Sequence, residues 1–154
     1  MDRKISANTP LEEYHGVPKG WSKDELVKTH LALGGEFDIS PGEISEPGAP
    51  SWLPDRYNWL QYRATLYKIA EGVKSCDKAC LELAVRYIEL NYFGSYSGFI
   101  RERLARNLKN KPLNRLQVER LCRHFQNQIE NKQCFQEFRE YLKLWKLIKK
   151  QLSD

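Results

Sequence analysis

Arginine, asparagine and glutamine are concentrated between residues 101 and 123, where their side chains could bind phosphate groups. This segment holds eight Lys/Arg against two Glu, and six of the eight are arginine. Arginine can grip a phosphate through two parallel hydrogen bonds, and asparagine and glutamine can contact phosphates or base edges. The residues that we expect to contact nucleic acid are Arg103, Arg106, Lys109, Arg115, Arg120, Arg123 and Asn127.

Two amphipathic helices joined by a proline-containing turn are expected to position these side chains. Ile100, Leu104 and Leu108 recur at helical spacing in the first helix. Asn114 and Gln117 have the spacing of a capping box at the start of the second helix. At 100° per residue, the arginines of both helices fall opposite the apolar residues. We therefore expect four guanidinium groups to lie in water. They belong to Arg103, Arg106, Arg120 and Arg123.

The same pattern is also typical of a solvated helical surface, so a protein-binding helical module is the alternative function. Its partner would engage an acidic N-terminal arm and an aromatic corner formed by Tyr92, Phe93, Tyr96 and Phe99. For these aromatic residues, packing between helices is favoured over stacking on bases.

Neither a metal site nor a catalytic site is predicted. The four cysteines, which would be the ligands of a zinc site, are Cys76, Cys80, Cys122 and Cys134. Structural zinc sites usually begin with closely spaced cysteines on a turn, whereas Cys80 and Cys122 lie on apolar helix stripes, which favours core cysteines. The scattered histidines are His15, His30 and His124. We expect no cofactor and no enzyme activity, with His30 on a helix surface and His124 at the edge of the basic surface.

The composition is that of a soluble globular protein. The chain has 154 residues, of which 41% are hydrophobic and 29% are charged, enough for one domain with a real core. No apolar run approaches the ~20 residues that span a bilayer, and the N-terminus lacks the apolar segment of a signal peptide. We expect a cytoplasmic protein with no membrane partner, and the oligomeric state is left open.

Charge and proline divide the chain near residue 54. Residues 1–55 hold five Lys/Arg against ten Asp/Glu, whereas residues 56–154 hold twenty against ten. Residues 40–54 contain four prolines and predict an extended linker. We therefore expect an acidic arm over 1–54, with one short helix at about 22–34, and a basic helical domain over 55–154.

The expected fold is all-α, either a compact bundle or a short α-solenoid-like array. About five helices follow the arm, over residues 55–74, 76–92, 97–108, 114–130 and 134–152, with a break near 131–133. In the fourth helix, the predicted core residues are Val118, Leu121, Cys122, Phe125 and Ile129. In the last helix, they are Phe135, Phe138, Leu142, Trp145, Ile148 and Leu152.

Overall fold

All regular secondary structure in the described part of the chain is helical, as predicted. The computed structural model describes residues 16–42, 56–92, 97–132 and 137–153. No helix in these ranges is long and apolar enough to cross a bilayer. The helices are α2 (Lys23–Ala32), α3 (Arg56–Lys74), α4 (Lys78–Leu90), α5 (Ser97–Leu108), α6 (Arg115–Glu130), α7 (Phe138–Ile148) and α8 (Lys150–Ser153).

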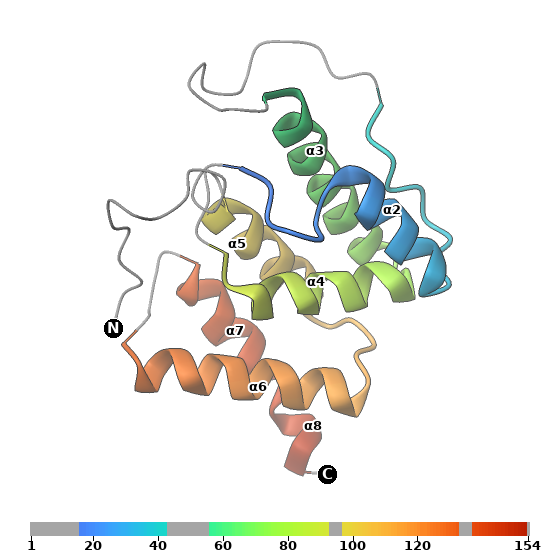
Figure 1. The fold of residues 1–154 in the computed structure, drawn as a ribbon. Coiled ribbons are helices and arrows are strands. Elements are labelled where there is room, and N and C mark those ends of the chain that lie inside the picture. Colours follow the sequence, from blue (N-terminus) through green and yellow to red (C-terminus); the bar gives the residue numbers. More distant parts are fainter. Residues whose placement is uncertain (1–15, 43–55, 93–96, 133–136, 154) are drawn as a thin grey trace.

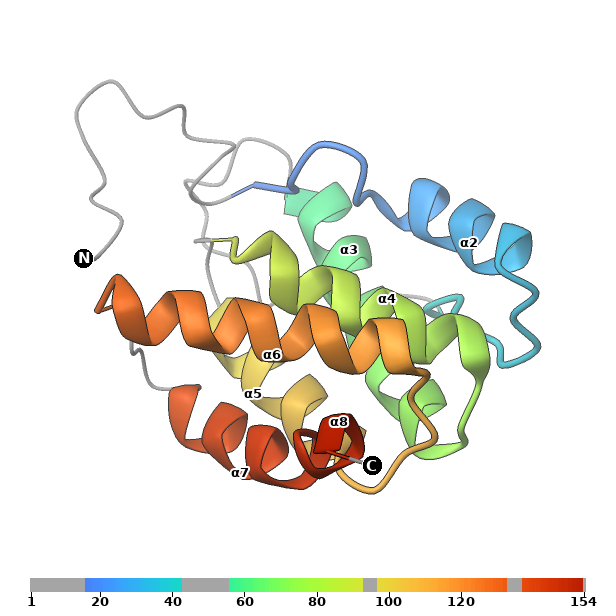
Figure 2. The same ribbon diagram turned by 90° about the horizontal axis from the view of Figure 1, so that it is seen from below.

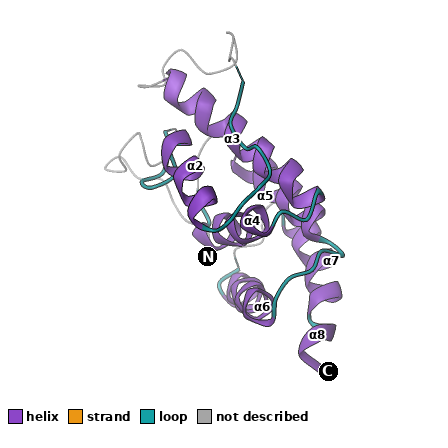
Figure 3. Ribbon diagram, turned by 90° about the vertical axis from the view of Figure 1, so that its right-hand side faces the viewer, coloured by secondary structure: helices purple, strands orange, loops and turns teal. Residues whose placement is uncertain are grey.

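The six longer helices form two layers (Figures 1 and 3). One layer contains α3, α5 and α7, and the other contains α2, α4 and α6. Neighbouring helices contact one another within each layer, and α4 packs across the layers against both α3 and α5. The short α8 packs against α6 and α7 near the C-terminus (Figure 2). The core lies between the layers, where one apolar stripe of each helix is removed from water.

Polar caps fix where several helices begin, and a left-handed residue follows the end of α6. The side chains of Ser22 and Asp77 accept hydrogen bonds from amides in the first turns of α2 and α4. Asn114 and Gln117 form the predicted capping box at the start of α6. The chain leaves α6 through Lys132, whose φ of 55° is left-handed, so the predicted break after this helix is confirmed.

Residues 16–42, the described part of the expected arm, pack onto the rest of the protein. Leu26 of α2 and Ile39 after it are buried in the same core as α3 and α4. The Trp21 ring also meets Tyr87 of α4 edge-on, with ring centroids 5.3 Å apart. This segment therefore contributes to the common core. Residues 43–54, which form most of the predicted linker, lie outside the described residues.

The buried faces of α6 and α7 match the predicted faces in part, with Phe138 and Ile148 of α7 buried as predicted. Tyr141 and Leu144 are buried in α7, whereas Leu142 is 41% exposed and Trp145 only partly buried. In α6, Val118, Leu121 and Phe125 are buried as predicted, whereas Ile129 is 42% exposed. Amphipathic spacing does not distinguish a residue at the core from one at its edge, so Leu142 and Ile129 were included in the predicted stripes. Phe135, also predicted to be buried, lies outside the described residues.

We expect Leu144→Ala to lower the free energy of unfolding by roughly 2–5 kcal/mol, because it opens a cavity in the core. Leu142→Ala on the same helix is the matched control and should change stability by less than about 0.5 kcal/mol. Chemical denaturation of both variants provides the measurement. A larger loss for Leu142→Ala would contradict the observed orientation of α7.

Candidate functional site

The two helices expected to form one phosphate-binding surface lie in different layers. Among the described helices, α5 and α6 are not direct neighbours, and both pack against α4 and α7 instead. Figure 3 shows α5 among the helices of one layer and α6 in the other. The predicted seven-residue surface is therefore divided between the two layers.

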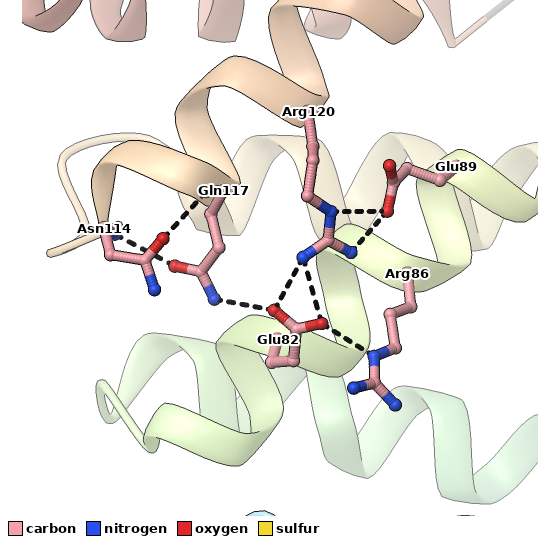
Figure 4. A network of polar contacts seen from close by, with 6 residues as sticks. All are labelled: Glu82, Arg86, Glu89, Asn114, Gln117 and Arg120. Atoms are coloured by element: carbon pink, nitrogen blue, oxygen red, sulfur yellow. Dashed lines mark hydrogen bonds and ion pairs between the residues drawn. The ribbon is translucent and has the colours of Figure 1, made fainter.

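Arg120 of α6 is held by two carboxylates of α4, so the expectation that it lies free in water is wrong. Its side chain is 20% exposed, and its Nη1 donates to both carboxylate oxygens of Glu82 at 3.1 Å. Its Nε donates to Glu89 Oε1 at 3.1 Å (Figure 4). Gln117 Nε2 also donates to Glu82, at 3.0 Å. This network fastens α6 to α4.

The same contacts keep Glu82 ionised. Burial raises the pKa of this carboxyl, but hydrogen bonds from Gln117, Arg120 and Arg86 outweigh burial and lower the pKa of Glu82 overall. The charge of Arg120 is therefore balanced within the protein, and its guanidinium is not available as an independent phosphate ligand.

The other predicted residues of α6 face away from the core. Arg123 and Asn127 are exposed, and Arg115 is exposed while its Nε lies 3.1 Å from Glu119 Oε1. Glu119 and Glu130 of the same helix balance part of this charge. The outer surface of α6 is therefore mixed in charge.

The predicted cations of α5 lie beside α7 and meet one of its carboxylates. Lys109 Nζ donates to Glu140 Oε1 at 2.9 Å, and Arg106 Nε lies 3.5 Å from the same oxygen. Lys143 of α7 reaches the other carboxylate oxygen, at 3.4 Å. The hydrogen bond from Lys109 and the positive charges lower the pKa of Glu140, which therefore stays ionised. Three cations thus share this acid, although Arg106 also pairs with Glu102 at 2.6 Å.

A basic stripe on α7, which the sequence analysis missed, extends this surface. Arg139, Lys143 and Lys146 are exposed and spaced at i, i+4 and i+7, so they share one helix face. Neither Arg139 nor Lys146 has an acidic partner among the described residues. The regular spacing is present in the sequence, beside the apolar stripe of the same helix. We use "basic face" for Arg103, Arg106, Lys109, Arg139, Lys143 and Lys146.

Charge is distributed unequally between the two layers. In the layer of the basic face, α3, α5 and α7 contain four, three and three Lys/Arg, with one Glu in each helix. In the other layer, α2, α4 and α6 contain two, two and three Lys/Arg, with two Asp/Glu in each helix. The formal net charges within these helix bounds are thus +7 and +1, or +6 and +1 without the buried Arg101, which Glu137 neutralises, so positive potential is concentrated on the first layer.

Arg101, within the basic segment of the sequence, is an interior residue. It is 3% exposed, and its Nε donates to Glu137 Oε1 at 2.9 Å. Its Nη1 donates to the Tyr92 carbonyl oxygen. Tyr92 is itself buried, and its hydroxyl donates to the Gly16 carbonyl oxygen at 2.9 Å. Arg101 therefore joins α5 to the start of α7 and to the end of α4.

The cysteines of the suggested zinc set do not come together. Cys76 is exposed, Cys80 is buried and Cys122 is partly buried, while Cys134 lies outside the described residues. Within the described ranges, the one group of three possible metal ligands is His30, Asp77 and Cys80. The prediction that His30 lies on a helix surface is wrong, because its side chain is buried against Asp77.

Hydrogen bonding explains this group better than a metal does. Asp77 Oδ1 accepts from the amides of Glu36 and Phe37, at 2.8 and 3.1 Å. Asp77 Oδ2 accepts from His30 Nε2 at 2.8 Å and from the Cys80 amide at 3.1 Å. Nitrogen and oxygen ligands of a tetrahedral zinc would lie roughly 3.3 Å apart, so the histidine and the carboxylate are placed as a donor and an acceptor.

The thiol of Cys80 is also poorly suited to nucleophilic chemistry. Burial, assisted by the nearby Asp77 carboxylate, raises the pKa of Cys80 far above its ordinary value. His124 is half-buried with its ring edge-on to Tyr141, and burial lowers the pKa of His124 to about 4. This imidazole is neutral near pH 7 and adds no charge to the basic face.

Asp77→Asn should lower the free energy of unfolding by roughly 2–3 kcal/mol at pH 7, because it disturbs four hydrogen bonds to a charged group. Burial raises the pKa of Asp77, but the hydrogen bonds from Glu36, Phe37, Cys80 and His30 lower it well below its ordinary value. Its stabilising effect is therefore complete above the unfolded-state pKa and is lost as pH falls through the folded-state pKa.

Urea titrations of the unaltered protein and Asp77→Asn at pH 7 and at lower pH measure this effect. The difference in stability should shrink progressively below about pH 4, the ordinary pKa of aspartate. A difference that persists unchanged in acid would contradict an ionised, hydrogen-bonded Asp77. Elemental analysis of the purified protein should find less than one equivalent of metal. One equivalent of zinc would contradict this expectation and restore the interpretation of a metal site.

Comparison with models of known protein families, with curated proteins and with solved structures found no match. The chemistry of the described residues therefore provides the basis for a functional proposal.

Proposed function

We propose that the protein binds nucleic acid without catalysis, through the basic face on α5 and α7. The observation that supports this proposal most strongly is the segregation of charge between the helices of the two layers, +6 against +1 when the neutralised Arg101 is left out. A polyanion is attracted to such a surface over the distance of a Debye length, ~8–10 Å at physiological salt. The proposed ligand is therefore a polymer of phosphates.

The arrangement of cations suits a chain of phosphates. Arg139, Lys143 and Lys146 follow one side of α7, and Arg106 and Lys109 approach them from α5 around Glu140. Exposed ion pairs contribute only ~0–1 kcal/mol, so a phosphate can replace an exposed carboxylate partner at little cost. Glu140 is shielded, and it holds the cations of the two helices side by side.

Of the residues first expected to contact nucleic acid, Arg103, Arg106 and Lys109 remain in this proposal. Arg115, Arg123 and Asn127 are on the opposite layer, and Arg120 is held by two glutamates. A phosphate chain bound along α7 would therefore not need any residue of α6.

A protein partner is the alternative, supported by the exposed side chains of Leu116, Ile129 and Leu142. Isolated apolar residues on a surface are normal and do not by themselves indicate a docking site. A partner protein attracted by charge would have to be strongly acidic, and it would compete with nucleic acid for the same face.

Fluorescence anisotropy with labelled single-stranded and duplex oligonucleotides at about 50 mM salt tests the proposal, since counterion release makes binding strongest there. We expect saturable binding that heparin displaces. Absence of binding to every nucleic acid, together with stoichiometric co-purification of one protein, would favour the alternative instead.

A further inference from the structure

We propose that a pocket between α2, α4 and α6 binds a small organic carboxylate. The site is separate from the proposed nucleic-acid surface and lies in the other layer of helices. Its volume is about 340 Å³, which is within the range of small-molecule sites. Its apolar lining comes from Leu33 at the end of α2, Leu81 of α4 and Pro112 before α6. This lining suits the apolar part of a small ligand.

Polar groups with unused donors share the wall of this pocket. Lys78 is exposed, and no carboxylate among the described residues pairs with it. Arg86 Nε donates to Glu82 Oε2 at 2.7 Å, but its two terminal nitrogens have no acceptor among the residues drawn in Figure 4. Asn114 uses Oδ1 in the capping box of α6, so its Nδ2 is a further donor. The pocket therefore offers three donor groups to an anion.

Glu82, which also lines the pocket, does not cancel this attraction. Both of its carboxylate oxygens already accept hydrogen bonds, from Gln117, Arg120 and Arg86. Three cations surround the site, those of Lys78, Arg86 and Arg120, against the carboxylates of Glu82 and Glu89, so one positive charge remains (3 − 2 = +1). A ligand with a single negative charge would balance it, which favours a monocarboxylate.

The end of α2 fixes the position of the Lys78 side chain. Gly34 follows α2 with a left-handed φ of 80°. A Cβ at this glycine would lie only 2.7 Å from Lys78 Cε, so the lysine stem crosses directly over the backbone there. The carbonyl groups at the end of a helix also favour a nearby cation. Lys78 is thus positioned before a ligand arrives, and less side-chain freedom is lost on binding.

The test uses hexanoate, which joins a carboxylate to a short apolar chain, and follows the amide chemical shifts of ¹⁵N-labelled protein. We expect saturable shifts concentrated in residues 78–86 and 112–117, which border the pocket. Hexanol lacks the charge and acetate lacks the apolar chain, so both should bind more weakly than hexanoate. Shifts that do not saturate with hexanoate, or equal affinities for hexanoate and hexanol, would overturn the inference.

Two substitutions in the pocket wall identify the cations responsible. Lys78→Gln combined with Arg86→Gln should weaken hexanoate binding at least about tenfold, the effect of losing one hydrogen bond to a charged group. The matched control is Lys28→Gln combined with Arg123→Gln, which removes two exposed charges of the same layer outside the pocket. Its hexanoate affinity should equal that of the unaltered protein. Equal affinities of the two double variants would contradict the assignment.

A further variant keeps the result informative if loss of Arg86 disturbs the hydrogen bonds of Glu82. Pro112 is exposed and takes no part in that network. Pro112→Glu adds a carboxylate to the pocket wall, so it should lower the affinity for hexanoate at least about tenfold by repulsion. Unchanged hexanoate binding in Pro112→Glu would place the ligand elsewhere and overturn the inference. None of these results depends on whether the basic face binds nucleic acid.

Discussion

Replacing Arg101 with methionine should lower the free energy of unfolding by roughly 3–5 kcal/mol, because it leaves the carboxylate of Glu137 buried without its charged partner. Arg101 is nearly inaccessible, and its Nε lies 2.9 Å from Glu137 Oε1. The substitution also removes the donor to the Tyr92 carbonyl oxygen. Such a loss is a large part of the stability of a domain this size.

A double-mutant cycle distinguishes the ion pair from lost packing. Arg101→Met combined with Glu137→Gln removes both charges, so the double variant should be more stable than Arg101→Met alone. Urea denaturation of the four proteins gives the coupling energy. Independent effects of the two substitutions would contradict a buried ion pair between α5 and α7.

Reversing two charges on α7 should produce the largest effect on binding. Arg139→Glu combined with Lys146→Glu should weaken nucleic-acid binding roughly 100- to 1000-fold at low salt, because a charge pair at 4 Å is worth ~1 kcal/mol in water and each reversal turns attraction into repulsion. Both side chains are exposed, so the helical circular dichroism should be unchanged.

The matched control for this variant is Arg115→Glu combined with Arg123→Glu on α6. It changes the net charge of the protein by the same amount, but on the opposite layer. Because attraction is screened over a Debye length of ~14 Å at 50 mM salt, this control should lose far less affinity than the α7 variant. Equal losses would show that only the total charge matters and that the basic face is not the site of contact.

Much of the fold could be predicted from local signals in the sequence. The capping box of Asn114 and Gln117 acts within four residues, so it could be recognised without knowledge of the tertiary structure. The hydrogen bond of His30 with Asp77 joins residues 47 positions apart. No local pattern connects two residues at that separation, and a histidine in an amphipathic helix was therefore assigned to the surface.

The candidate site was predicted only in part, for a similar reason. Sequence proximity suggested that α5 and α6 form one surface, but packing placed them in different layers. The burial of Arg101 depends on Glu137, which is 36 residues away. The stripe of Arg139, Lys143 and Lys146 could have been found from its spacing, because helix periodicity applies to charged residues as well as to apolar ones.

The salt dependence of binding tests the central claim most directly. If the five exposed cations of the basic face contact phosphates of a single strand, log affinity should fall with log salt with a slope of about −3.5, or roughly 100-fold between 50 and 200 mM. Lys109 is left out of this count because it is 21% exposed and held by Glu140. Anisotropy titrations of oligothymidylate across this range measure the slope. Undetectable binding at the lowest salt, or an affinity that does not change with salt, would contradict recognition of nucleic acid by the basic face.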